Sequence, residues 1–274
     1  MTVDVRSSDD PRVSLEAVGD FLRAKPVEHN LLLSLLTQRS DRPEDGRYWW
    51  ATESDAVVGF VFQSPTRFRA LISPAQPAVV DALVEVVADA APGLPGVMGE
   101  AATAARFAGQ WAEQRRVAVT PREGQRLYRL TRVCSPDGVP GRLRTAGPDD
   151  RRVLVPWAAA FVEETGGHPQ HPADIVDRHL DHGRLWVWDD GGPVSMAAAS
   201  AEVAGVVRVA FVYTPHERRG RGYAAACVAS VSEQVAAAGQ ESVLYAQLHN
   251  PTSNAVYRRV GYEPVAEILI YEFG

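Results

Sequence analysis

The feature that most limits the possible folds of this chain is a weak internal repeat. Residues 9–13 (DDPRV) align with residues 149–153 (DDRRV), and Phe21 aligns with Phe161 at the same shift. At both places a short polar strand is expected before an acidic helix start and an apolar-periodic helix. Because 274 residues are enough for two domains, the repeat predicts two α/β domains of one topology.

A segment rich in proline and glycine separates the two copies. The run from Cys134 to Gly141 (CSPDGVPG) has the composition of a linker. After it we expect a strand, two helices, three strands, a helix, a strand, a helix and a final strand, and the first half has a similar order. The expected domains are residues 1–138 and 139–274.

Composition excludes several classes of function. The chain is 46% hydrophobic, and its 34 acidic and 28 basic residues give a net charge of −6, which argues against general nucleic-acid affinity. No stretch approaches the ~18 apolar residues of a membrane span. The first residues do not resemble a signal peptide, and Cys134 and Cys227 fit no disulfide framework or zinc site. A cytoplasmic protein that binds no membrane is the default expectation.

The clearest chemical signal is an apolar strand that leads through a loop of glycine and arginine into a helix. The strand is expected at residues 206–213, and the helix begins near Tyr223. Gly220 and Gly222 permit tight turns and leave backbone N–H groups unobstructed. Free N–H groups at a helix N-terminus favour an anion such as phosphate. Three arginines add positive charge, namely Arg218, Arg219 and Arg221. Together these features predict a diphosphate site.

This segment resembles motif A of the GNAT superfamily of N-acetyltransferases, whose diphosphate loop has the pattern Arg/Gln-x-x-Gly-x-Gly/Ala. Residues 219–224 (RGRGYA) match that pattern completely. Residues 250–262 (NPTSNAVYRRVGY) resemble motif B, in which Asn and Tyr precede a Gly-aromatic pair. The resemblance covers about residues 141–274. It implies a mixed α/β fold with a mostly antiparallel sheet and splayed central strands, and the repeat then indicates two GNAT-like domains in tandem.

The resemblance implies acetyl-CoA as co-substrate and no metal. The strand before the loop would bind the pantetheine arm through its backbone, the loop would hold the diphosphate, and two polar residues of motif B would lie near the pantetheine or adenine end. The cofactor-binding residues implied in this way are Phe211, Val212, Tyr213, Arg218, Arg219, Gly220, Arg221, Gly222, Tyr223, Ala224, Asn250 and Ser253.

The resemblance also implies direct acetyl transfer to a primary amine. Tyr257 would lie beside the thioester sulfur as general acid, and packing in the core is the alternative for this side chain. The general base stays open. Glu163, at the end of an expected helix, and Glu202, on an expected middle strand from Val194 to Glu202, are candidates. For both, an exposed side chain without a catalytic role is the alternative.

Other acceptor-side candidates follow Glu163 in the chain, namely Glu164, His168 and His171. The two histidines, with His179 and His182 further on, raise the alternative of a metal site. Prolines interrupt their spacing and no cysteine joins them, so a solvated or substrate-facing loop is the favoured interpretation.

The first half lacks the diphosphate loop. Residues 74–80 (PAQPAVV) follow the matching strand, without a Gly-x-Gly pattern or an arginine, and their prolines have no N–H to donate. Residues 101–115, at the place of motif B, contain no Asn…Tyr pair. The expected first domain is therefore a degenerate copy that does not bind CoA.

The expected function is an acetyl-CoA-dependent N-acetyltransferase whose amine acceptor is not readable. A non-catalytic acyl-CoA-binding or regulatory protein on the same fold is the alternative. A longer acyl-CoA stays open if Ala197–Ala199 line the donor pocket. RNA binding through Arg218–Arg221 lacks a supporting basic surface with aromatic residues. A homodimer formed through an exposed sheet edge is also left open.

Overall fold

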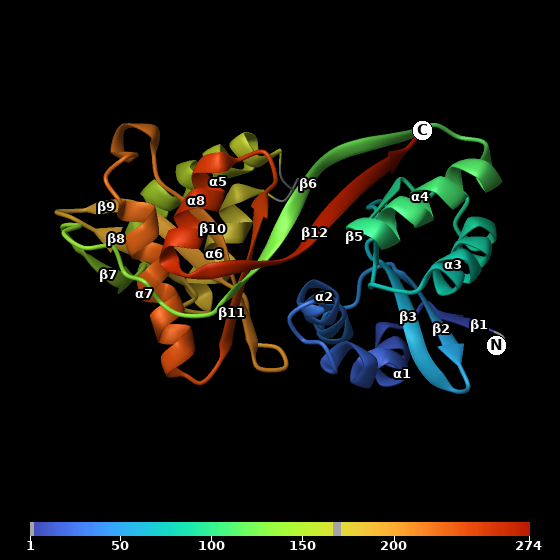
Figure 1. The fold of residues 1–274 in the computed structure, drawn as a ribbon. Coiled ribbons are helices and arrows are strands. Elements are labelled where there is room, and N and C mark those ends of the chain that lie inside the picture. Colours follow the sequence, from blue (N-terminus) through green and yellow to red (C-terminus); the bar gives the residue numbers. More distant parts are fainter. Residues whose placement is uncertain (1–2, 167–170) are drawn as a thin grey trace. The chain divides into compact units, whose positions relative to one another are not determined.

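The computed structural model describes residues 3–166 and 171–274, and the chain divides into two compact units (Figure 1). Unit 1 comprises Met1–Leu127 and Ala266–Gly274, and unit 2 comprises Tyr128–Val265. The expected boundary between residues 138 and 139 differs from this division at both ends of unit 2. The reason lies in two long strands that are described below.

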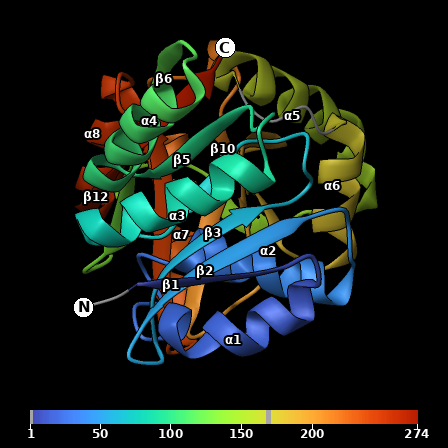
Figure 2. The same cartoon turned by 90° about the vertical axis from the view of Figure 1, so that its right-hand side faces the viewer.

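Unit 1 begins with a strand and two helices, as the repeat predicts. Its elements are β1 (Asp4–Ser8), α1 (Pro11–Arg23), α2 (Asn30–Asp41), β2 (Arg47–Glu53), β3 (Ala56–Gln63), β4 (Ala70–Ile72), α3 (Pro77–Ala90), β5 (Gly96–Glu100) and α4 (Ala101–Arg115). Figure 2 shows α1 and α2 on one side of strands β1 to β3, and α3 and α4 on the other. The core beneath α3 and α4 includes Trp49, Leu83, Phe107 and Trp111.

Unit 2 repeats this order. Its elements are β7 (Arg142–Thr145), a 3₁₀ turn (Pro148–Asp150), α5 (Arg151–Thr165), α6 (Pro172–Asp181), β8 (Leu185–Asp189), β9 (Pro193–Ala199), β10 (Val206–Tyr213), a 3₁₀ turn (His216–Arg218), α7 (Tyr223–Ala237), β11 (Glu241–Gln247) and α8 (Pro251–Val260). Leu154 and Val176 pack α5 and α6 on one face of the sheet. On the other face, Val231 and Val260 pack α7 and α8.

The repeated acidic segment begins a helix in both units. In unit 1, Oδ1 of Asp10 accepts a 2.8 Å hydrogen bond from the N–H of Arg12, and Pro11 occupies the first turn of α1. This is a normal N-cap, because the first N–H groups of a helix have no intrahelical acceptor. In unit 2, Oδ2 of Asp150 accepts a 2.8 Å hydrogen bond from the N–H of Gly147, just before α5.

Two long strands, β6 (Val119–Leu130) and β12 (Tyr262–Phe273), each have one end in either unit. In unit 1 the sheet order is β1-β2-β3-β4-β5-β12-β6, and β12 runs antiparallel to β5, with Ile268 opposite Glu100. In unit 2 the order is β12-β6-β11-β10-β9-β8-β7. Each unit thus completes its sheet with a segment from the other half of the sequence, which explains the shifted boundary.

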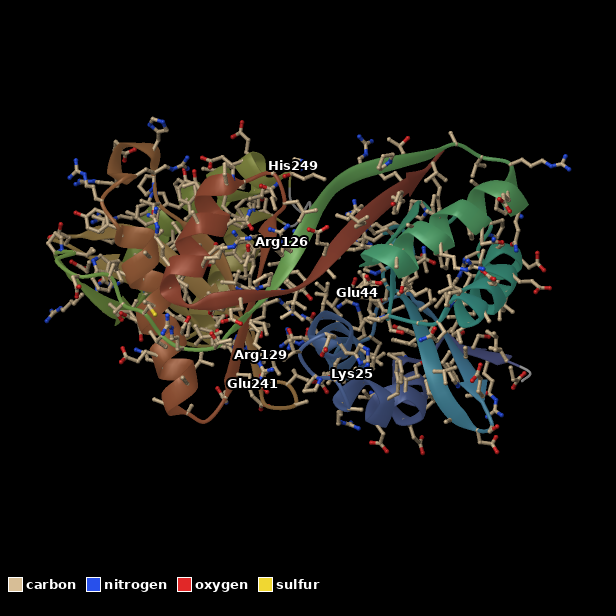
Figure 3. All side chains as sticks on the ribbon, viewed as in Figure 1. Lys25, Glu44, Arg126, Arg129, Glu241 and His249 are labelled. Carbon is tan, nitrogen blue, oxygen red and sulfur yellow. The ribbon has the colours of Figure 1, made fainter. Side chains whose placement is uncertain are left out.

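Side chains fasten the end of β6 within unit 2. Nε of Arg129 lies 2.6 Å from Oε2 of Glu241 at the start of β11, and Figure 3 shows the two side chains next to each other. Most described strand pairs are antiparallel, whereas β4–β5 and β10–β11 are parallel. The expected mixed α/β fold with a mostly antiparallel sheet is confirmed. Among the described residues, no helix is long and apolar enough to cross a membrane.

Candidate active site

Strands β10 and β11 pair only along their first halves. Their parallel register runs from Val206 opposite Glu241 to Val209 opposite Leu244. Both strands continue beyond this point, β10 to Tyr213 and β11 to Gln247, and no further pair joins them among the described residues. The two strands therefore part in the middle of the sheet, as expected for splayed central strands.

A β-bulge lies on β10 just beyond this parting point. Ala210 is opposite Ala198 of β9, but the next registered pair joins Tyr213 to Met196, so β10 contains one extra residue. Phe211 has a φ of 51°, a value that non-glycine residues rarely adopt. Phe211 and Val212 consequently lie outside the regular pairing with β9 and with β11.

Two helices pack against the bulge. The ring of Phe211 lies 5.0 Å from the ring of Phe161 on α5, centroid to centroid, and 5.9 Å from the ring of His179 on α6. Burial lowers the pKa of His179 to about 4. Its imidazole is therefore neutral at pH 7, because the cationic form loses solvation when it is buried.

The loop after β10 opens into α7 with two glycines in left-handed conformations. Gly220 has a φ of 77° and Gly222 a φ of 83°. The first hydrogen bond of α7 runs from the N–H of Ala226 to the carbonyl of Gly222, at 3.0 Å. The N–H groups of residues 223–225 are thus without an intrahelical acceptor, at the positive end of the helix dipole. The first turn, with Tyr223 and Ala224, can receive an anion.

The start of α7 is also bonded to the turn between β8 and β9. The hydroxyl of Tyr223 donates a 2.6 Å hydrogen bond to Oδ2 of Asp190, in the turn between β8 and β9. A Cβ added to Gly222 would lie 2.8 Å from Cγ2 of Val139. The chain therefore needs glycine at position 222 both for its φ and for space.

The three loop arginines differ in their surroundings. Nη2 of Arg219 lies 2.7 Å from both carboxylate oxygens of Glu164, at the end of α5. Its Nε donates a 2.9 Å hydrogen bond to the carbonyl of Thr214. The hydrogen bond with Glu164 raises the pKa of Arg219. Arg218 and Arg221 are exposed and form no ion pair with any residue that the structure describes. The sequence had predicted the same diphosphate-binding role for all three arginines.

Motif B forms helix α8, and its first polar residues cap that helix. Oδ1 of Asn250 accepts a 3.0 Å hydrogen bond from the N–H of Ser253. Both residues therefore have a local structural role, which accounts for an Asn at the start of the motif. The neighbouring Asn254 donates to the carbonyl of Gln247 at the end of β11, at 2.8 Å. This bond connects the start of α8 to one of the two parting strands.

Tyr257 lies on the buried face of α8. Its ring packs 6.4 Å from that of Tyr128 and 6.3 Å from that of Tyr262, measured between centroids. The surrounding cluster includes Val209 and Leu244, the last pair before β10 and β11 part. Burial raises the pKa of Tyr257, so the phenol keeps its proton at neutral pH.

The two carboxylates proposed as general bases lie in different places. Glu163 is exposed in the last turn of α5, beside Glu164. Glu202 does not lie on a strand, contrary to expectation, because β9 ends at Ala199 and the chain turns before β10. In that turn its carboxylate accepts a hydrogen bond from the N–H of Gly205. Glu202 thus precedes the start of β10, whereas the bulge lies in the second half of that strand and the loop lies beyond its end, roughly 15–25 Å along the strand.

The histidine cluster divides among several roles. His168 lies outside the described residues. His171 caps α6, with Nδ1 accepting a 3.3 Å hydrogen bond from the N–H of Ala173. Nδ1 of His182 lies 2.7 Å from the carbonyl of Arg178. Within residues 3–166 and 171–274, no group of three or more His, Cys, Asp or Glu side chains is arranged to hold a metal ion.

Part of the chain matches a known family model, and nearly all of it superposes on solved structures. Residues 191–269, which contain the bulge, the loop and α8, match the family model described as FR47-like protein. No curated protein matches the sequence. An acetyltransferase of the GNAT family from Colwellia psychrerythraea superposes with a TM-score of 0.64, covering 99% of this chain and 100% of that chain at 12% identity. The chain has the GNAT fold.

Two further solved structures share the GNAT fold over nearly the whole chain. A GCN5-related N-acetyltransferase from Sphaerobacter thermophilus has a TM-score of 0.61, with 98% of this chain and 95% of that chain covered at 17% identity. A tandem GNAT protein from the clavulanic acid biosynthesis pathway has a TM-score of 0.56, with coverages of 100% and 98% at 12% identity. The similarity to a tandem protein agrees with the repeat in this sequence.

Proposed function

We propose that the chain is an acetyl-CoA-dependent N-acetyltransferase that transfers the acetyl group directly to a primary amine. The observation that carries the proposal is the course of β10. It parts from β11 after Val209, bulges at Phe211, and leads within a few residues to the Gly220–Gly222 loop. A strand segment outside the regular pairing, followed by an anion-binding helix start, suits an amide-containing arm attached to a diphosphate. The GNAT fold supports an acetyltransferase function.

In the proposed donor site, successive parts of the chain bind the thioester end, the pantetheine arm and the diphosphate of the cofactor. Phe211, Val212 and Tyr213 supply backbone groups for the pantetheine amides. The diphosphate takes the N–H groups at the start of α7 and the charge of the exposed arginines, Arg218 and Arg221. Asn250 and Ser253 border the same site from the start of α8, and the cap between them fixes that helix end.

The proposed chemistry needs a proton for the leaving group. The amine nitrogen attacks the acetyl carbonyl carbon, a C–N bond forms, the C–S bond breaks, and the CoA thiolate takes the proton of Tyr257. A backbone N–H at the bulge stabilises the negative charge that develops on the carbonyl oxygen. The position of Tyr257 in the cluster around Val209 and Leu244 supports this role. Its protonated phenol at neutral pH supports it as well.

The attacking amine must also lose a proton. We propose Glu163 as the acceptor of that proton, through water, because it lies in the turn of α5 that is bonded to the loop. Glu202 is not retained for this step, since it lies beyond the opposite end of β10.

We further propose that unit 1 binds no CoA. Strand β4 pairs with β5 along its whole length, from Ala70 opposite Val97 to Ile72 opposite Gly99, and no splay opens between them. A Cβ added to Gly99 would lie 2.6 Å from Cγ2 of Ile72, which reflects how closely the two strands approach. The chain then continues through Pro74 and Pro77, which have no N–H to offer a phosphate.

A non-catalytic acyl-CoA-binding protein is the second candidate function. The observation in its favour is that the motif-B side chains already have structural roles, Asn250 as a helix cap and Tyr257 in the core. A binder of this kind would use the donor site without transferring the acetyl group.

The two candidates are separated by incubating the full chain with acetyl-CoA and a panel of amines. Free CoA should be separated chromatographically, because Cys134 is a free and partly exposed thiol that would consume a thiol reagent. Release of CoA that depends on one amine, together with the matching N-acetyl product, supports the enzyme. Binding of acetyl-CoA without release for any amine supports the binder.

A further inference from the structure

One face of α5 follows the parting strand and its loop. Trp157, Phe161 and Glu164 lie on this face, because residues spaced by three and four are neighbours on a helix. The ring of Trp157 lies 6.3 Å from that of Tyr213, and the ring of Phe161 lies 5.0 Å from that of Phe211. Glu164 comes last and reaches Arg219 in the loop.

The last turn of α5 is bonded to both strands at the splay. On the β10 side, Glu164 binds Arg219, and Tyr213 donates a weak 3.5 Å hydrogen bond to Oε1 of Glu164. On the β11 side, Nε2 of Gln247 donates a 3.0 Å hydrogen bond to the carbonyl of Thr165. Two adjacent residues of α5 thus connect the far ends of two strands that do not pair with each other there.

The side chain of Arg219 is held by several contacts at once. Besides Glu164 it binds the carbonyl of Thr214, and its guanidinium carbon lies 5.5 Å from the centre of the Tyr213 ring. Thr214 is itself fixed, because its hydroxyl lies 2.9 Å from that of Ser195, which also donates to the carbonyl of Tyr213 at 3.1 Å. A guanidinium with these partners is folded back toward α5.

We propose that Glu164 and Arg219 are a positioning pair, which holds the start of the diphosphate loop against the last turn of α5 and so sets the width of the splay. In this assignment Arg219 does not bind phosphate, and the charge that meets the diphosphate comes from Arg218 and Arg221. The part of the inference that concerns the cofactor rests on the proposed function. The part that concerns the loop does not.

The alternative role for Arg219 predicts the opposite sign. If Arg219 were a phosphate ligand, Glu164 would compete with the diphosphate for the same guanidinium, and Glu164→Gln would tighten CoA binding. If the pair positions the loop, Glu164→Gln loosens the loop and weakens CoA binding. The sign of one affinity change therefore distinguishes the two roles.

The first test uses amide hydrogen exchange on the ligand-free full chain. We expect residues 214–224 to exchange about two- to five-fold faster in Glu164→Gln and in Arg219→Gln, the range for a partly exposed ion pair. The double variant should exchange no faster than Arg219→Gln alone, because that substitution already removes the ion pair together with the other contacts of Arg219. Unchanged exchange in Glu164→Gln, or effects that multiply in the double variant, would overturn the proposal.

The matched control is the ion pair at the other end of α5. Asp177 binds Arg151 through two hydrogen bonds of 2.6 and 2.9 Å, and both side chains are about as exposed as those of the positioning pair. Asp177→Asn should leave exchange in residues 214–224 unchanged. Faster exchange there in this control would show that any lost ion pair loosens the loop, and would overturn the specific role of Glu164.

The second test is a CoA titration of the same variants. Glu164→Gln should raise the Kd of CoA about two- to five-fold, and tighter binding would overturn the proposal. If wild-type chain binds no CoA, the proposed function fails. The exchange experiment then still decides whether Glu164 and Arg219 hold the loop.

Discussion

The hydroxyl of Tyr128 donates a 2.6 Å hydrogen bond to Oδ1 of Asn254, which connects the end of β6 to helix α8 inside unit 2. The amide nitrogen of Asn254 donates in turn to the carbonyls of Gln247 and Asn250. Tyr128 precedes the linker of residues 134–141, so the core of unit 2 depends on a residue from the first half of the sequence.

Removing this hydroxyl should destabilise unit 2. Tyr128→Phe leaves Oδ1 of Asn254 buried without its donor, so we expect the free energy of unfolding to fall by about 1–3 kcal/mol. Urea denaturation followed by circular dichroism measures the change. Tyr271→Phe, which removes a hydroxyl that bonds no described residue, is the control and should change stability by less than about 0.5 kcal/mol. Equal stability of Tyr128→Phe and wild type would contradict the role of this bond.

The two loop glycines should differ in their tolerance to alanine. Both have positive φ, which costs about 1–2 kcal/mol for a residue with a Cβ. Only at Gly222 would the new Cβ also meet a neighbour, 2.8 Å from Cγ2 of Val139. Gly222→Ala should therefore lower thermal stability and CoA affinity more than Gly220→Ala. In Gly109→Ala, the control in helix α4, added helix propensity should stabilise the chain. Equal effects at positions 220 and 222 would contradict the packing argument.

The buried imidazole of His179 should make stability depend on pH. Its pKa in the folded chain is about 4, lower than the ordinary 6.5, so the unfolded chain binds a proton that the folded chain does not. The free energy of unfolding therefore carries no cost from His179 above pH 6.5, and it decreases as the pH falls from 6.5 toward 4. Replacing the ring in His179→Phe should reduce the slope of unfolding free energy against pH in this window, by up to about 1.4 kcal/mol per pH unit. A slope identical to wild type would show that His179 titrates normally.

Tyr257→Phe tests the proposed general acid. Loss of an acid from the chemical step should lower kcat by about 10²-fold, and CoA affinity should stay within about two-fold because the ring remains in the core. Because burial raises the pKa of the phenol, wild-type activity should show no loss from Tyr257 ionisation up to pH 10. Unchanged turnover in Tyr257→Phe would remove Tyr257 from the mechanism.

Much of unit 2 is predictable from the sequence because its signals are local. Strand 206–213 and the helix that begins at Tyr223 lie where the apolar run and the Gly/Arg loop place them. The prediction that Glu202 lies on a strand was wrong, because the apolar run of β9 gives no sign that the strand ends at Ala199. Positive φ angles at Ala204 and Gly205 form the turn instead.

Relationships between distant residues were not readable. The positions of β6 and β12, each of which has an end in both units, depend on which strands are neighbours in the sheet. No spacing pattern in the sequence predicts strand neighbours. For the same reason the sequence predicted one role for all three loop arginines, although Arg219 binds Glu164, which lies 55 positions away. Such pairings become visible only when the fold brings α5 to the loop.

The central claim is one donor site per chain, formed at the splay of β10 and β11 and at the loop that follows. Calorimetric titration of the full chain with CoA tests it most directly. We predict one CoA per chain, an affinity that falls as salt increases, and weaker binding in Arg221→Gln. No binding, two CoA molecules per chain, or an affinity that Arg221→Gln leaves unchanged would contradict the claim.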